Sequence, residues 1–216
     1  MAYSLPSHLS FCLLAGEPYF LDLRRNRYFR LDGDLRAEFL SFLKGEGEAN
    51  AGLLLERRIL VRTKRGQEIA SVSIEVPDRS LVEEPAGTAD IRPGMLAAAA
   101  TLLVKARLER RIASFSAMIE RRRQVSGMPE HADCDALYEC ARRFDAARRL
   151  LPLGANCLPD SLALMDFLSR RGYAPQLVIG VRRDPFAAHC WVQAAGALLN
   201  ERVDVAASFT PIHAIP

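Results

Sequence analysis

The chain has 216 residues, half of them hydrophobic, and carries a formal net charge of +3 at pH 7. That length fits one large domain or two small ones, and the hydrophobic fraction is sufficient for a real core. The mild charge gives no support for a nucleic-acid-binding function, which needs basic residues clustered on one face, and the longest apolar run, residues 95–104, is too short to span a bilayer.

The N-terminal part alternates short apolar runs with turn residues, a pattern typical of strands and short helices. Asp32 offers a helix cap, and the apolar residues that follow it at helical spacing predict a first helix that ends at Gly45. The expected elements, in chain order, are an apolar run at 9–14, strands at 19–23 and 27–31, helices at 35–45 and about 51–58, and a strand pair at 59–62 and 71–76.

Residues 77–94 contain three prolines, several acidic residues and little periodicity, a composition typical of a linker. We therefore divide the chain into a unit at 1–84, a linker at 85–94 and a unit at 95–216. Arg121-Arg122-Arg123 falls where cations favour the helix dipole, and we interpret it as a solvated helix end. The elements expected in the second unit are helices at 95–124, 133–150 and 157–171, then strands at 176–181, 188–193 and 197–203. This order predicts an α+β fold with two units.

Five cysteines, an odd number without a CxxC pair, are spread along the chain. This usage favours a reducing compartment and argues against both a disulfide framework and a structural zinc site. The N-terminus has neither the basic segment nor the apolar segment of a secretory signal. We therefore expect a soluble cytoplasmic protein without a bound metal.

Cys157 stands at the predicted start of a helix, because Pro159 suits a first turn, where its missing N–H group is not needed. The free N–H groups and the positive dipole end of such a helix stabilise a thiolate and lower its pKa. Taken alone, Cys157 is also consistent with a buried cysteine that packs as a small hydrophobic side chain.

His189 lies on a predicted hairpin, opposite a carboxylate. If the turn is the three-residue loop 194–196, with Gly196 in the left-handed position, His189 pairs with Glu201 across the two strands. A carboxylate in that position orients the imidazole ring and stabilises the imidazolium. Asp204 lies an odd number of residues from Glu201 and so points to the other face, which selects Glu201. The alternative for His189 is a histidine with a structural role.

The neighbours of His189 on its strand invite two further interpretations. Trp191 shares a face with His189 and would shield the site from water, although plain core packing also accounts for it. Cys190 points to the opposite face, toward the core. Cys134 and Cys140 fall on a predicted helix and are interpreted as packing residues.

Together, Cys157, His189 and Glu201 suggest thiol acyl transfer. The histidine takes the proton of Cys157, the thiolate attacks a carbonyl, and a thioester forms that water or an amine then resolves. Backbone N–H groups at the helix start, including that of Cys157, would stabilise the oxyanion, and the Asn156 side chain is a candidate additional donor.

Several short motifs surround these residues. They are Cys157-Leu158, Ile179-Gly180-Val181, the segment from Phe186 through His189 and Trp191 to Val192, and Asn200-Glu201. In these motifs the chain resembles the B proteins of lasso-peptide biosynthesis, which have a transglutaminase-like, papain-like cysteine protease domain. The resemblance covers most of residues 95–216. Two positions depart from the family pattern: Cys190 replaces the usual alanine, and Glu201 stands where aspartate is common.

The first unit carries a second resemblance, through the segments 20–23 and 28–31. They are similar to the PqqD-like leader-recognition domain fused to many of these proteins, a small winged-helix-like fold of three strands plus helices. The resemblance implies that the leader peptide adds as a strand to an exposed sheet edge. The implied leader-binding residues are Arg27, Tyr28, Phe29, Arg30 and Leu31. The alternative is that Tyr28 and Phe29 merely pack the core, and DNA binding is disfavoured because acidic residues balance the basic ones.

The resemblance implies a cysteine endopeptidase that cleaves the leader from the core of a ribosomally made lasso-peptide precursor in bacterial antibiotic biosynthesis. It also implies a partner, an asparagine-synthetase-like cyclase that activates a core carboxylate with ATP. The chain has no GxxxxGK[ST] loop, so we expect no cofactor here and assign ATP use to the cyclase. Two alternatives stay open: a transglutaminase or amidase acting on another acyl substrate, and a non-catalytic leader-binding adaptor.

Overall fold

The computed structural model describes residues 2–46, 51–64, 69–84, 92–123 and 133–215. The chain forms two compact units, Met1–Ile74 with Thr210–His213 and Glu75–Phe209 with Ala214–Pro216. Both units contain helices and strands, so the predicted α+β class is confirmed. Within the described residues, no helix is both long enough and apolar enough to cross a membrane.

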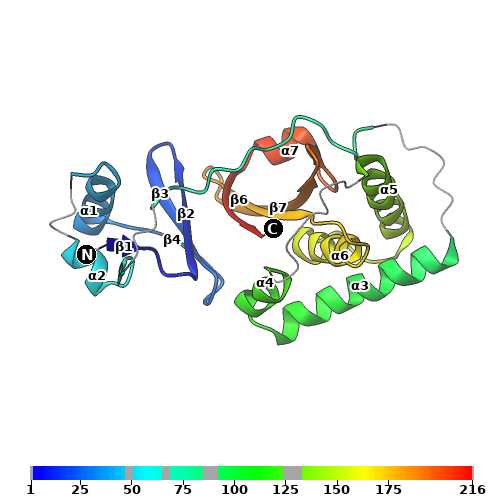
Figure 1. The fold of residues 1–216 in the computed structure, drawn as a ribbon, viewed down its shortest axis with the longest axis horizontal. Helices are drawn as coiled ribbons and strands as arrows, with labels where there is room; N and C mark the ends of the chain where they lie inside the picture. The colour runs from blue at the N-terminus through cyan, green and yellow to red at the C-terminus, as the bar shows by residue number, and fades with distance from the viewer. Residues whose placement is uncertain (1, 47–50, 65–68, 85–91, 124–132, 216) are drawn as a thin grey trace. The chain divides into compact units, whose positions relative to one another are not determined.

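A three-stranded antiparallel meander forms the main sheet of the first unit (Figure 1). Its strands are β2 (Leu9–Leu14), β3 (Glu17–Asp22) and β4 (Arg27–Arg30). The turn Ala15-Gly16 joins β2 to β3, and both of its residues have positive φ, which suits a tight two-residue hairpin. Because β3 is central, β4 lies at an edge of this sheet.

Aromatic side chains make the core of the first unit. The Phe20 ring stacks on Phe11 and on Phe29, with 5.6 and 5.1 Å between ring centroids. Phe39 meets both Phe11 and Phe20 edge-on, a favourable geometry for aromatic pairs. The remaining elements are α1 (Gly33–Leu43), α2 (Gly52–Glu56), β1 (Ala2–Ser4) and β5 (Val61–Thr63).

The strand pair expected at 59–62 and 71–76 is wrong. β5 pairs with β1, at the other end of the unit's sequence. Residues 71–76 form no strand, although the Val72 N–H donates to the Phe11 carbonyl at 3.0 Å. Because β1 and β5 lie far apart in the sequence, no local pattern predicts that they pair.

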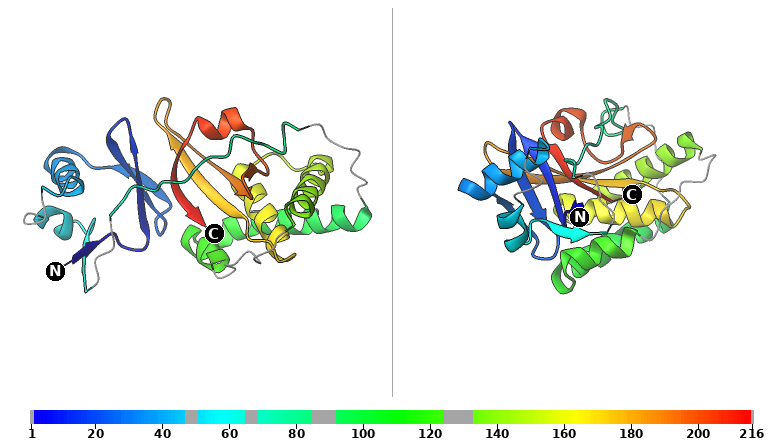
Figure 2. Two further views of the ribbon diagram at one scale, coloured as in Figure 1. Left: turned by 45° about the horizontal axis from the view of Figure 1, so that its top comes forward. Right: turned by 60° about the vertical axis from the view of Figure 1, so that its left-hand side comes forward.

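The helices of the second unit pack against a sheet of order β8-β7-β6-β9 (Figures 1 and 2). Residues 210–213 of β9 are the ones grouped with the first unit above. Helix α6 packs on β7 with one side and on α3 with another, and most of its side chains are buried. The elements are α3 (Pro93–Ile112), α4 (Phe115–Arg123), α5 (Cys134–Leu150), α6 (Cys157–Ser169), β6 (Gln176–Arg182), β7 (Ala187–Ala194), β8 (Ala197–Leu198), α7 (Val203–Ala207) and β9 (Thr210–Ile215).

The helix predicted at 95–124 is two helices, α3 and α4. Ala113 has extended backbone, which ends α3. The Ser114 side chain then accepts a hydrogen bond from the Ala117 N–H at 3.2 Å, as an N-cap residue does, and α4 begins. The strand predicted at 197–203 is likewise too long, because β8 ends at Leu198 and helix α7 begins at Val203.

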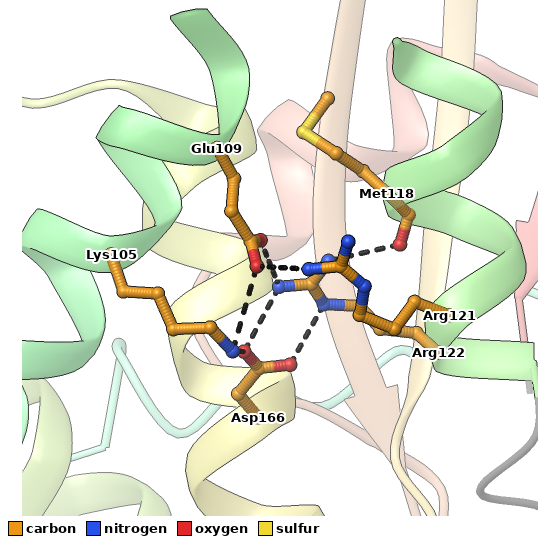
Figure 3. Close-up of polar contacts among 6 residues, drawn as sticks. All are labelled: Lys105, Glu109, Met118, Arg121, Arg122 and Asp166. Carbon is orange, nitrogen blue, oxygen red and sulfur yellow. Dashed lines mark hydrogen bonds and ion pairs between the residues drawn. The ribbon is translucent and has the colours of Figure 1, made fainter. Parts of the chain in front are cut away.

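Arg122 was expected in a solvated helix end, but its side chain is only 5% exposed. Its guanidinium donates to the Asp166 carboxylate at 2.7 and 2.9 Å and to Glu109 at 2.9 Å (Figure 3). Lys105 adds a second cation, 3.0 Å from Asp166. This cluster ties α3, α4 and α6 together, so Arg122 is an internal residue while Arg121 beside it is mostly exposed.

Replacement of Arg122 by alanine should therefore destabilise the second unit strongly. It would leave the buried Glu109 carboxylate and the partly buried Asp166 carboxylate without their main partner, and breaking such a pair costs about 3 to 5 kcal/mol. The matched control is Arg143→Ala, which removes an exposed pair with Glu139 and should cost less than about 1 kcal/mol. Chemical denaturation of both variants measures the two free energies of unfolding, and equal losses would contradict a buried role for Arg122.

The boundary between the compact units lies at 74/75 and not at 84/85. Residues 79–83 pack along the open edge of β8: Leu198 donates its N–H to the Arg79 carbonyl and accepts from the Leu81 N–H, at 2.9 and 3.0 Å. The expected linker 85–94 falls largely outside the described residues, and α3 already includes Pro93. Residues 79–83 therefore belong to the second unit, and we name them the β8 strap.

Candidate active site

Cys157 is the first residue of α6, as predicted. Asn156 before it is extended and is the N-cap residue, but its side chain makes no capping hydrogen bond. The Asp160 carboxylate instead accepts from the Asn156 N–H at 3.1 Å, which holds the first turn. Cys157 thus stands at the N-terminal end of a largely buried helix, where unpaired N–H groups and the helix dipole favour a negative charge.

Cys157, His189 and Glu201 come together in the structure. The His189 Nε2 atom lies 2.5 Å from Glu201 Oε2, and both side chains are about one-fifth exposed. The Cys157 side chain lies near the imidazole, and each of the two groups shifts the pKa of the other. Because Nε2 is engaged by Glu201, Nδ1 is the ring nitrogen left for Cys157. The three groups form a thiol–imidazole–carboxylate chain of the kind that activates a nucleophile.

The hairpin register used to select Glu201 is wrong, although the selected residue is in place. The turn between β7 and β8 is the two-residue loop Ala195-Gly196, with φ of 49° and 75°. Gln193 therefore pairs with Leu198, and Ala194 pairs with Ala197. Continued pairing in this register would set Arg202 opposite His189. Instead β8 stops at Leu198, and an irregular segment brings Glu201 to the imidazole.

Asn200 and the β8 strap hold this irregular segment. The Asn200 Oδ1 atom accepts from the Val192 N–H at 2.7 Å, and its Nδ2 donates to Ser161 Oγ at 2.9 Å. The Ser80 hydroxyl donates to the Glu201 carbonyl at 2.6 Å. No role was assigned to Asn200 or Ser80 from the sequence. The Asn200-Glu201 motif was a signal that could have identified Asn200, but no sequence pattern marks Ser80.

The other residues considered for the site divide between surface and core. Asp204 is exposed and pairs with Arg202 at 3.0 Å, so it takes no part. Trp191 is fully buried, and its indole N–H donates to Gln193 Oε1 at 3.0 Å, which supports core packing. The ring beside His189 is Phe209, with 5.3 Å between centroids, a contact that the sequence did not reveal.

Cys190 is buried in the core, as predicted. It also lies close enough to the Cys157 side chain for the two thiols to shift each other's pKa. Alternation along β7 separates the Cβ directions of His189 and Cys190, yet the side chain at the start of α6 reaches both. The nucleophile candidate therefore has two neighbours on β7 and not one.

These contacts shift the pKa values of the group. The hydrogen bond with Cys190 and then the contact with His189 lower the pKa of Cys157 to about 4, against the opposing effect of burial. Hydrogen bonds with Cys157 and Glu201 raise the pKa of His189 to about 9. Burial alone would raise the pKa of Glu201, but the hydrogen bond with His189 holds it below its usual range. Near neutral pH the site therefore holds a thiolate beside an imidazolium.

The lowered pKa predicts how alkylation of Cys157 depends on pH. The thiolate is present above about pH 4 and is lost as pH falls through that value, so iodoacetamide should still react rapidly at pH 5. In His189→Ala the midpoint should move up toward the ordinary value of 9.0. Mass spectrometry of the tryptic peptide 150–170, which contains no other cysteine, follows this thiol alone. A wild-type midpoint above pH 8 would contradict the proposed ion pair.

Comparison with known proteins adds two findings. Residues 100–214, more than half of the chain, match the family described as the transglutaminase-like superfamily, and this range includes all three site residues. The microcin J25-processing protein McjB of Escherichia coli is 43% identical to the chain over 47 residues. That match covers 22% of this chain and 23% of McjB. No significant match was found among solved structures.

Proposed function

Since this chain belongs to the transglutaminase-like superfamily, we propose that it is a cysteine peptidase that removes the leader from a lasso-peptide precursor. The observation that carries the proposal is the contact of Cys157 with His189, and of His189 with Glu201, at the start of a buried helix. The partial match to McjB, whose name describes the processing of microcin J25, supports a peptide precursor as substrate.

The proposed reaction follows from the geometry. The Cys157 thiolate attacks the carbonyl carbon of the last leader residue, while the Cys157 N–H and the Asn156 side chain stabilise the oxyanion. The His189 imidazolium gives its proton to the leaving core amine, and the C–N bond breaks to leave a thioester. His189 then takes a proton from water, whose oxygen attacks the thioester and releases the leader carboxylate. Glu201 keeps the ring oriented throughout.

The proposal assigns leader capture to β4, the edge strand of the first unit. An edge strand offers backbone groups to which an extended peptide can add. Of the five residues expected to bind the leader, Leu31 is buried in the core and Phe29 stacks on Phe20, so their side chains hold the strand in place. Arg27 and Arg30 are exposed and remain available to the peptide.

Two proline substitutions on β4 test strand addition. N–H groups point alternately to the two sides of a strand, and so one of Arg27 and Arg30 faces β3 and the other faces the open edge. Proline at the outward position should keep the melting temperature and weaken leader binding about tenfold, because it removes a donor and obstructs pairing. Proline at the inward position should lower the melting temperature. Fluorescence anisotropy with a labelled leader peptide measures the affinity, and an unchanged affinity in the stable variant would refute strand addition.

The partners follow from this assignment. The substrate is the precursor peptide, bound through its leader, and the released core passes to an asparagine-synthetase-like cyclase that consumes ATP. We assign no cofactor to this chain, and we place the reaction in the cytoplasm, where the precursor is made.

The direct test combines the protein with a precursor peptide, in the presence and absence of the cyclase. Mass spectrometry should detect free leader, and its appearance should depend on this chain. If the leader binds and the precursor stays intact even with the cyclase and ATP present, the chain is an adaptor. If an amine replaces the leaving group, it is a transglutaminase.

A further inference from the structure

Cys190 is a buried thiol beside the nucleophile, and no step of the proposed reaction forms or breaks a bond at its sulfur. Helix α6 packs on β7, and Ser161, which lies one turn after Cys157 on the same side of α6, reaches the Cys190 carbonyl, so the Cys157 and Cys190 side chains lie close enough to shift each other's pKa. The Ser161 hydroxyl donates to the Cys190 carbonyl at 3.4 Å, which fixes the strand against the same helix. Neither cysteine is disulfide-bonded in the structure. A second cysteine held beside a reactive one is the arrangement that resolves an oxidised thiol.

We propose that Cys157 and Cys190 are a redox modification site, in which a peroxide converts the two thiols into a reversible disulfide that blocks the nucleophile. Formation of the disulfide does not depend on which substrate the protein has. Its effect on activity rests on the proposed peptidase function.

The chemistry balances with hydrogen peroxide as the oxidant. The Cys157 thiolate attacks one peroxide oxygen, an S–O bond forms, the O–O bond breaks, and the departing hydroxide takes a proton from the His189 imidazolium. The Cys190 sulfur then attacks the sulfenic sulfur, the S–S bond forms, and hydroxide leaves with the Cys190 proton as water. Two thiols lose two electrons and two protons, and peroxide becomes two waters. A dithiol reductant reverses the bond by thiol–disulfide exchange.

The charges at the site favour this order of events. At rest the hydrogen bond with the Cys157 thiolate, and then burial, raise the pKa of Cys190, so it stays protonated. Cys157 is the thiolate and reacts first. Oxidation makes Cys157 a neutral sulfenic acid, which removes the negative charge that kept Cys190 protonated. Cys190 can then act as the resolving nucleophile, before a second peroxide drives Cys157 to the irreversible sulfinic acid.

Mass spectrometry of the whole protein tests the site without any substrate. After mild peroxide treatment, the wild-type chain should lose the mass of two hydrogen atoms, and trypsin should yield the peptides 150–170 and 184–202 joined by a reducible bond. In Cys190→Ala the peptide 150–170 should instead gain two oxygen atoms that dithiothreitol does not remove. The matched control, Cys140→Ala on α5, should behave as the wild type does.

The outcomes separate this inference from the proposed function. A wild-type peptide 150–170 that is oxidised to the sulfinic acid without cross-linking overturns the inference, as does a cross-link to any other cysteine. If Cys190→Ala folds poorly, the presence or absence of the Cys157–Cys190 cross-link in the wild type still tests the inference. Where leader release is observed, oxidation should lower its rate at least tenfold and dithiothreitol should restore it. If Cys157 and Cys190 cross-link but the protein never cleaves the precursor, the peptidase proposal is wrong and the redox-site proposal is supported.

Discussion

Replacing Cys157 with alanine should abolish leader release, with a fall in rate of about 10³-fold or more. In the proposed reaction the thiolate at the start of α6 is the protein group that bonds covalently to the substrate carbonyl carbon, and alanine has no nucleophile to replace it. The measurement is the rate of leader release from precursor in the presence of cyclase, followed by mass spectrometry. The matched control is Cys134→Ala, which changes an exposed cysteine at the start of α5 and should retain the wild-type rate.

The same variant separates binding from catalysis. Cys157→Ala leaves the residues of β4 unchanged, so it should bind the leader with the affinity of the wild type. This inactive variant should therefore form a stable complex with the precursor and could be used to isolate it. If Cys157→Ala cleaves the precursor as fast as the wild type does, the nucleophile is another residue and the assignment of the active site is wrong.

Replacing His189 with alanine should lower the rate by about 10²- to 10⁴-fold. The variant loses the proton donor for the leaving amine, and its Cys157 pKa rises because a counter-ion is gone. His8→Ala, which changes a histidine of the first unit, is the matched control.

The pH profile distinguishes this role from a structural one. For the wild type, activity should fall below about pH 4 as Cys157 gains a proton, and above about pH 9 as His189 loses one. In His189→Ala the residual rate should instead rise with pH, as the thiolate forms at its less perturbed pKa. A variant that keeps the acidic limb of the wild-type profile would contradict the role given to the imidazole.

The sequence predicted the nucleophile and its helix because those signals are local. Pro159 and the residues around it mark a helix start without reference to the rest of the chain. The edge strand β4 was also predictable, since short alternating runs and a polar turn specify a hairpin. The structure has these elements where the local pattern placed them.

Glu201 was selected through a register that the structure does not have. The turn uses Ala195 with a positive φ, a conformation that alanine rarely adopts, and so the sequence favoured a longer loop with one left-handed glycine. The carboxylate still reaches His189 because Asn200 and Ser80 fix the segment after β8. Ser80 lies more than a hundred residues away in sequence, and no local pattern could have identified it.

The burial of the charged Arg122 side chain could not be predicted from the local sequence either. The arginine run at the end of α4 has the composition of a solvated surface, and only the positions of Glu109 and Asp166 make Arg122 an internal residue. The contact between Cys157 and Cys190 is similar, since strand alternation does not describe how a helix end approaches the strand. Such features depend on the packing of elements and not on their identity.

The most direct test of the proposed function is to run the reaction in water enriched in oxygen-18 and to weigh the released leader. Hydrolysis through a thioester on Cys157 predicts one heavy oxygen in the new C-terminal carboxylate, in the wild type and not in Cys157→Ala, which releases none. A precursor that binds and stays intact, or a leader that leaves joined to an amine, would contradict a leader peptidase.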